Sequence, residues 1–180
     1  MLGHDRLVLC YHGVSREWPA VMAIHPERLE RQVGMLLERG YVPATFTQAV
    51  LDPPAPRTLA VTFDDACRSV LEHGGPILRR LGVPATLFVP TAYIGAAEPM
   101  AWPGVAHWLD TPHRDELLPL DWSEITSLQA AGWEIGSHTR THPRLTGLDD
   151  ARLAEELAGS RAEIEARLGR ACGSLAYPFG

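Results

Sequence analysis

Three short and nearly continuous apolar segments place the strongest constraint on the fold. They occupy residues 7–11 (LVLCY), 59–63 (LAVTF) and 85–89 (ATLFV). Segments of this length that are apolar throughout are typical of strands buried on both faces of a parallel sheet. Longer segments with helical spacing separate them, and the first of these carries an apolar stripe of Leu29, Val33, Leu36 and Leu37. The alternation predicts an α/β fold with a parallel sheet.

Length and the remaining patterns predict one domain. The 180 residues are enough for one substantial domain with its own core and too few for two. A long helix is expected up to Leu168, capped by Asp149 or Asp150. Residues 90–119 have little periodicity and are expected to form a long irregular loop. A last apolar segment at 175–177 predicts a strand near the C-terminus.

Composition excludes several classes of protein. The net charge of −6 argues against a nucleic-acid partner, which normally requires a basic patch. No run of about 18 apolar residues predicts a membrane span. The N-terminal residues lack a basic segment followed by an apolar one, so no signal peptide is expected and the predicted location is the cytoplasm. The cysteines lack CxxC spacing, so we expect buried thiols rather than a zinc ribbon or disulfides at Cys10, Cys67 and Cys172.

Three polar segments directly follow, or end, predicted strands. They are residues 62–65 (TFDD), 137–142 (SHTRTH) and 176–180 (AYPFG). The carboxyl ends of parallel strands meet at one edge of a sheet, and α/β proteins place their functional sites there. We therefore expect the three segments to meet in one site.

The side chains of these segments suit a divalent metal. The adjacent carboxylates of Asp64 and Asp65 repel each other and need a partner, although capping of the following helix is an alternative role for one of them. The spacing of His138 and His142 puts both imidazoles on one side of a turn, although two surface histidines would show the same spacing. One carboxylate and two imidazoles are a suitable ligand set for zinc. The Glu of the HExxH motif of zinc proteases is absent.

Taken together, the motifs resemble those of the polysaccharide deacetylase family, also called carbohydrate esterase family 4. The matching runs are TFDD at 62–65, SHTxTHPxL at 137–145 and YPFG at 177–180, and YHGV at 11–14 is similar to the start of many members. The resemblance implies a distorted parallel (β/α) barrel of about seven strands with its site at the carboxyl ends of the strands. Residues 1–180 are therefore expected to form a single catalytic domain of this kind.

The resemblance also implies a role for each residue of the site. Asp64 corresponds to the catalytic base, and the metal ligands correspond to Asp65, His138 and His142. Phe179 corresponds to the residue whose backbone N–H helps to hold the oxyanion. The implied cofactor is zinc, with cobalt or nickel used by some members. The implied activity is metal-dependent removal of N-acetyl groups from a carbohydrate, such as an N-acetylglucosamine polymer or glycoconjugate.

The sequence departs from the family pattern at three places. Ala66 stands where members often have glycine, and Ala176 stands where many have an arginine that contacts the catalytic base. The Leu-x-His motif that supplies the general acid is absent. The domain is therefore expected to be incomplete at its C-terminal end, in a natural chain that continues past Gly180.

Further side chains are candidates for binding the sugar. His12 follows the first predicted strand, Tyr177 belongs to the last motif, and Trp102 lies in the long loop, where its ring would stack on a sugar. A histidine at the rim and an aromatic core within the loop are the structural alternatives for His12 and Trp102. Two other functions stay open: an amidohydrolase acting on a non-sugar amide, and a non-catalytic carbohydrate-binding pseudoenzyme or truncated fragment.

Overall fold

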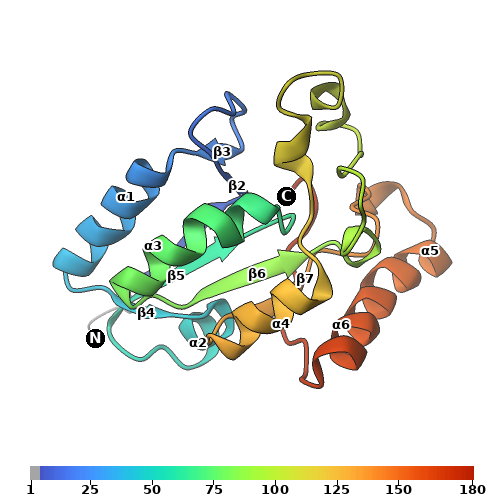
Figure 1. Ribbon diagram of the computed structural model, residues 1–180. Coiled ribbons are helices and arrows are strands. Elements are labelled where there is room, and N and C mark those ends of the chain that lie inside the picture. The colour runs from blue at the N-terminus through green and yellow to red at the C-terminus, as the bar shows by residue number, and fades with distance from the viewer. Residues whose placement is uncertain (1–4) are drawn as a thin grey trace.

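The fold is built on a parallel sheet, seen in a computed structural model that describes residues 5–180. Residues 1–4, part of the segment in which no signal peptide was found, lie outside the described residues. The strand order is β1–β5–β6–β7, and β4 pairs with the first half of β5 (Figure 1). The strands of the sheet are β1 (Asp5–Tyr11), β4 (Val42–Ala44), β5 (Arg57–Phe63), β6 (Ala85–Val89) and β7 (Glu134–Ser137).

Helices connect the strands, as the alternating pattern predicts. A small second sheet pairs β2 (Gly13–Val14) with β3 (Ala23–Ile24). Its strands have only two residues each, too few for a pattern to indicate them. The helices are α1 (Pro26–Glu38), α2 (Phe46–Leu51), α3 (Gly75–Leu81), α4 (Trp122–Ala130), α5 (Asp150–Ala154) and α6 (Ser160–Leu168).

The two central strands are buried as predicted, but β1 is not. Every residue of β6, and every residue of β5 after Arg57, is buried. In β1, by contrast, the side chains alternate between exposed and half-buried, and Val8 is 42% exposed. The expectation of burial on both faces was wrong for this strand, because β1 pairs only with β5 among the described strands and one of its faces is uncovered.

The long C-terminal helix is also confirmed. Asp149 is its cap, with its carboxylate accepting a hydrogen bond from the Arg152 N–H at 2.8 Å. The helix continues from α5 through a π-helical turn, Glu155–Gly159, into α6. The expected strand at 175–177 is reduced to one isolated bridge between Leu175 and Ser137.

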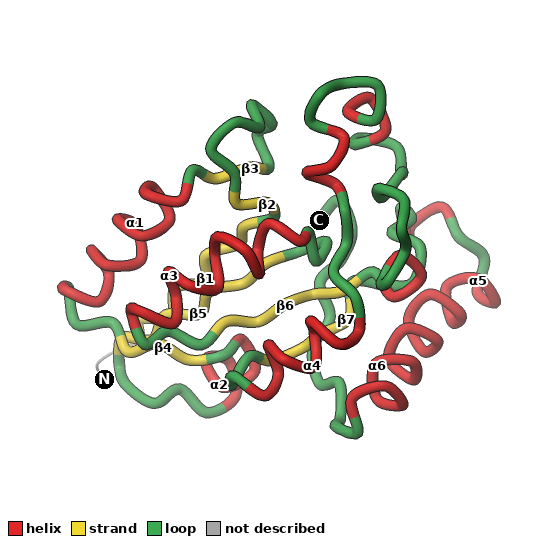
Figure 2. The backbone as a smooth tube through the Cα atoms, viewed as in Figure 1, coloured by secondary structure: helices red, strands yellow, loops and turns green. Residues whose placement is uncertain are grey.

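The loop between β6 and α4 is irregular, as expected, with only short 3-10 turns. Figure 2 shows this loop rising from the carboxyl end of β6 near the C-terminus. Within residues 5–180 the sheet is open and no closed barrel is formed. No helix in this part of the chain has the length and apolar character needed to cross a membrane.

Candidate metal centre

The three polar segments meet at the carboxyl edge of the sheet. Asp65 Oδ1 lies 3.4 Å from His138 Nε2 and 3.4 Å from His142 Nε2. All three side chains are buried, and one ligand atom from each lies within 4.8 Å of the others. The structure thus brings together the three residues expected as metal ligands, although 73 residues of sequence separate Asp65 from His138 (138 − 65 = 73).

Strand pairing extends into the site and fixes the backbone there. The N–H of Asp64 donates to the Tyr11 carbonyl at 2.9 Å, one residue beyond the end of β5. The N–H of His138 donates to the Val89 carbonyl at 2.9 Å, one residue beyond the end of β7. These hydrogen bonds of the sheet therefore fix the backbone positions of Asp64, the candidate base, and His138, a candidate ligand, relative to each other.

Backbone strain is concentrated in the same segments. In the described chain, the non-glycine residues with positive φ are Asp65, Ala66, Thr139, His142 and Phe179, with φ from 56° to 70°. A left-handed conformation costs a residue with a Cβ roughly 1–2 kcal/mol. Such strain persists where the surrounding structure demands it, typically at functional sites. Ala66, where the family often has glycine, accordingly adopts the conformation that favours glycine.

His138 is oriented by a backbone carbonyl. Its Nδ1 lies 2.9 Å from the carbonyl oxygen of Ala176, which leaves Nε2 directed at Asp65. A ligating histidine commonly donates its other ring N–H in this way. Burial lowers the pKa of His138, but the neighbouring carboxylates of Asp65 and Asp64 raise it by more, so the net shift is upward. The backbone carbonyl of Ala176 thus orients a candidate ligand, although Ala176 lacks the arginine side chain that many family members have at this position.

His142 is held by aromatic packing. Its ring stacks on Trp102 with centroids 4.1 Å apart, and Phe179 meets it edge-on at 4.9 Å. Burial lowers the pKa of His142 to about 4, so the ring is neutral at pH 7, as a metal ligand must be. Trp102 is only 4% exposed, so its ring packs against a candidate ligand and presents little surface to a sugar.

Glu156 holds the loop that carries His142. This carboxylate is 2% exposed and accepts hydrogen bonds at 2.8 Å from the backbone N–H groups of Arg140 and Thr141. The Thr141 hydroxyl adds a third bond at 2.6 Å. Sequence reasoning missed this residue. The available signal was its helical spacing from Leu153 and Ser160, which places an acidic residue on the buried side of the helix.

Asp64 lies beside the three candidate ligands. Its Oδ2 is 4.0 Å from His138 Nε2 and accepts a hydrogen bond from the Cys10 thiol at 3.5 Å. Burial raises the pKa of Asp64, and the charges of His138 and His12 only partly oppose this. For Asp65, burial also raises the pKa, but the close contact with the His138 imidazole lowers it by more. The two adjacent carboxyl groups are therefore shifted in opposite directions, as expected where one is a ligand and the other a base.

Buried oxygens without partners show that the residues fit a cation. Asp65 Oδ1 and Asp64 Oδ1 are both buried and have no hydrogen-bond partner among the described residues. Buried polar atoms are rarely left unpaired, and the need for a bound ion is one common explanation. One carboxylate oxygen and two imidazole nitrogens converging on a point make a donor set that suits a divalent metal.

The other predicted residues line the rim. His12 is half-buried at the end of β1, close enough for its charge to act on Asp64 and Asp65. Tyr177 is 63% exposed and Phe179 is 45% exposed. Within the described part of the chain, the backbone N–H of Phe179 has no acceptor, so this donor is available.

Comparisons with known proteins identify the family of the chain. Residues 52–180 match the polysaccharide deacetylase family. The chain is 24% identical over 178 residues to YxkH of Bacillus subtilis (strain 168), covering 96% of this chain and 56% of that one. It is 24% identical over 132 residues to a poly-beta-1,6-N-acetyl-D-glucosamine N-deacetylase of Staphylococcus aureus (strain MSSA476), covering 69% of this chain and 41% of that one. The chain thus spans about half the length of these relatives.

Solved structures show the same fold. Streptococcus pyogenes deacetylase PplD in complex with acetate superposes with a TM-score of 0.78 at 20% identity, over 96% of this chain and 73% of that one. IcaB from Ammonifex degensii superposes with a TM-score of 0.75 at 25% identity, over 99% of this chain and 76% of that one. Since the family match covers more than half of the sequence and includes all three segments of the site, the chain belongs to the polysaccharide deacetylase family.

Proposed function

We propose that this chain catalyses metal-dependent removal of N-acetyl groups from a carbohydrate. The observation that carries the proposal is the buried convergence of Asp65, His138 and His142, with the carboxylate of Asp64 directly beside it. An N-acetylglucosamine polymer or glycoconjugate is the proposed substrate. The name of the Staphylococcus aureus relative supports this class of substrate.

Each candidate residue has a distinct task in the hydrolysis. A divalent cation held by Asp65, His138 and His142 would polarise the amide carbonyl and lower the pKa of water toward about 7. Asp64 accepts the proton of the attacking water, because its raised pKa brings it nearer to the working pH than an ordinary aspartate. The unpaired backbone N–H of Phe179 donates to the oxyanion of the tetrahedral intermediate.

The departing amine must also receive a proton. Among the described residues, His12 lies near Asp64 without belonging to the ligand set. We propose that His12 contacts the sugar, whereas the proton comes from the histidine of a Leu-x-His motif in the proposed continuation of the chain past Gly180. The continuation of the chain past Gly180 and the closure of the sheet into a barrel stay predictions, which a structure of a longer natural chain would test.

Zinc is the proposed metal, with cobalt or nickel as alternatives, and calorimetry tests its binding directly. Metal-stripped protein should bind one zinc ion, and His142→Ala should weaken binding by at least tenfold, because it removes one of three protein ligands. His73→Ala is the control, since this histidine is exposed and is not one of the three converging side chains. Equal zinc affinity in parent and His142→Ala would contradict the assigned site.

Acetate release from N-acetylglucosamine oligomers tests the reaction. Zinc-loaded parent should release acetate, and Asp64→Asn should lose at least 100-fold in kcat while still binding zinc, because proton transfer by a positioned base contributes roughly 10²–10⁴-fold. Binding of the oligomer without release would favour the non-catalytic carbohydrate-binding alternative. Release from a non-sugar acetamide alone would favour the amidohydrolase alternative.

A further inference from the structure

We propose that a pocket beside the metal centre binds a carboxylate-bearing sugar, adjacent in the glycan to the sugar that loses its acetyl group. The inference rests on the proposed function, because it assigns a neighbouring subsite to the same substrate. It specifies the substrate as an acidic glycan, in which N-acetylated sugars stand next to sugars that carry a negative charge.

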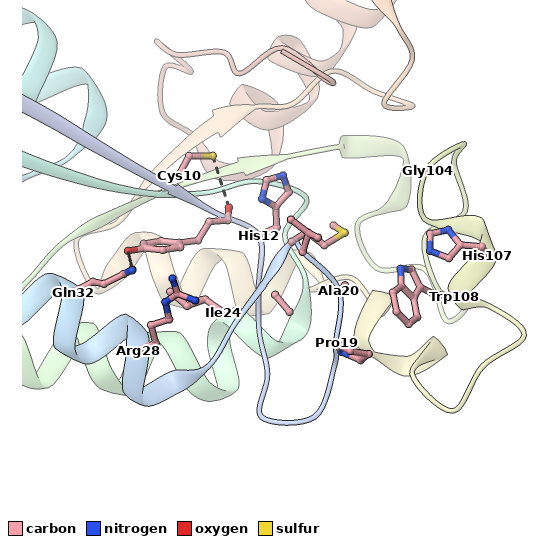
Figure 3. A pocket seen from close by; sticks show the side chains of 14 residues that line it. Cys10, His12, Pro19, Ala20, Ile24, Arg28, Gln32, Gly104, His107 and Trp108 are labelled. Atoms are coloured by element: carbon pink, nitrogen blue, oxygen red, sulfur yellow. Dashed lines mark hydrogen bonds between the residues drawn. The ribbon is translucent and has the colours of Figure 1, made fainter.

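The pocket lies between α1 and the long loop. Figure 3 shows Arg28 and Gln32 of α1 on one side, His107 and Trp108 of the loop on the other, and His12 between them. Its volume is about 720 Å³, within the range of roughly 300–1,000 Å³ typical of ligand sites. The cavity is therefore large enough for a sugar ring with a substituent.

The pocket adjoins the metal centre at two of its lining residues. Cys10 and His12 both line it. The thiol of Cys10 contacts the carboxylate of Asp64, and the charge of His12 acts on Asp64 and Asp65. A glycan with its acetamide at the metal centre would thus place a neighbouring sugar in this pocket.

The charges of the lining favour an anion. Arg28 has no carboxylate within 4.0 Å among the described residues, and no aspartate or glutamate lines the pocket. Its neighbour Glu27 is instead paired with Arg16 at 3.2 Å. An acid-free pocket with a free guanidinium is notable in a chain of net charge −6. A guanidinium presents a planar set of donors that matches a carboxylate.

Arg28 faces the interior of the pocket, where further donors are available. Its charge acts on the hydroxyl of Tyr11, another lining residue, whose pKa burial raises to about 12. That hydroxyl donates to Gln32 Oε1 at 2.8 Å, which directs the amide and leaves its NH₂ group free to donate. Arg28, Gln32 and the two histidines thus offer mainly donors, which complements the acceptor oxygens of an acidic sugar.

The remaining lining is apolar and suits the face of a sugar ring. Met22, Ile24 and Trp108 contribute this surface. Trp108 is fixed by packing edge-on against the buried Trp18, with centroids 5.7 Å apart. The ring of Trp108 would stack on the sugar, and the guanidinium of Arg28 opposite it would bind the carboxylate. Ligand sites usually combine an apolar surface with a few polar groups in this way.

Binding of a hyaluronan hexasaccharide tests the proposal. This oligomer alternates N-acetylglucosamine with glucuronic acid, and its methyl ester has the same linkages without the charge. Calorimetry on zinc-loaded parent should show the acid form binding about two- to fivefold more tightly than the ester, as expected for one exposed ion pair. Arg28→Gln should remove this preference, whereas Arg31→Gln, an exposed position on the same helix outside the pocket, should keep it.

The outcomes separate this proposal from the proposed function. Three outcomes would each overturn the acidic subsite. They are equal binding of acid and ester by the parent, a preference for the acid that persists in Arg28→Gln, and no binding of the acid form. Acetate release from neutral N-acetylglucosamine oligomers would then still support the deacetylase. Conversely, consider that the parent prefers the acid form and Arg28→Gln loses this preference, while no oligomer releases acetate. That result would support the acidic subsite and contradict the proposed deacetylation.

Discussion

The indole of Trp102 stacks on the imidazole of His142, with centroids 4.1 Å apart and planes inclined by 21°. The other ring nitrogen of His142, Nδ1, has no hydrogen-bond partner among the described residues. A ligating histidine is usually oriented by such a bond. Here the orientation depends on packing instead, so a residue of the long irregular loop contributes directly to the metal centre.

Replacing Trp102 by Leu should therefore weaken metal binding. Leucine keeps the site apolar but cannot stack on the imidazole of His142 and fix its orientation. We therefore expect the zinc affinity to fall by about tenfold, as it does when a residue that orients a metal ligand is replaced. Calorimetry on metal-stripped protein measures this. Trp122→Leu is the matched control, because Trp122 is half-buried at the start of α4 and packs against Arg167. Unchanged affinity in Trp102→Leu would show that the stack does not orient His142.

Glu156→Gln should loosen the loop that carries His142. The change removes the charge from an acceptor of three hydrogen bonds, so we expect the free energy of unfolding to fall by about 1.5–3 kcal/mol. Zinc affinity should fall by about 10- to 100-fold. Urea unfolding and calorimetry measure the two effects. The adjacent Glu155→Gln is the control, because its exposed ion pairs contribute roughly 0–1 kcal/mol. Similar losses in both variants would contradict the assigned role.

The metal centre was predictable because its residues lie in local motifs. Asp64 and Asp65 follow a strand that is apolar throughout, and the two histidines share one short segment after another strand. Parallel strands bring their carboxyl ends to one edge, so order and spacing along the chain were sufficient to place these side chains together.

The residues that support the ligands were not predictable in the same way. Trp102 and Glu156 reach the site from a loop without periodicity and from the side of a helix, so their partners depend on tertiary packing. The exposure of β1 was missed for a related reason. Val8 and Cys10 are apolar like the residues of β5, and only the position of the strand at the edge of the sheet decides that their face is uncovered.

Glu134→Gln should destabilise the fold in a pH-dependent manner. Burial would raise the pKa of Glu134, but hydrogen bonds from Ser174, Thr47 and Thr86 lower it overall. A lowered folded-state pKa means that the stabilisation is present above the unfolded pKa, about 4.3, and is lost as pH falls through the folded value. At pH 7 we expect a loss of about 1–2 kcal/mol, since the carboxylate is partly solvated. Urea unfolding from pH 7 to pH 2 should show the difference shrinking below about pH 4; a difference that stays constant would contradict this.

The thiols should be unreactive in the native chain, although the expectation of a buried thiol was wrong for Cys10, which is exposed at the edge strand β1. Burial of its sulfur and then the charge of Asp64 raise the pKa of Cys10 to about 11, and burial also raises the pKa of Cys67 and Cys172. Because the thiolate is the nucleophile, reaction of metal-free protein with a disulfide reagent at pH 8 should be roughly 100-fold slower than in urea. The rate should rise about tenfold per pH unit up to pH 10, as the thiolate fraction does. Asp64→Asn should speed the reaction of Cys10, whereas Asp121→Asn, an acidic helix cap, should not. Fast reaction of Cys10 in the native protein at pH 8 would show that Asp64 and burial do not suppress formation of its thiolate.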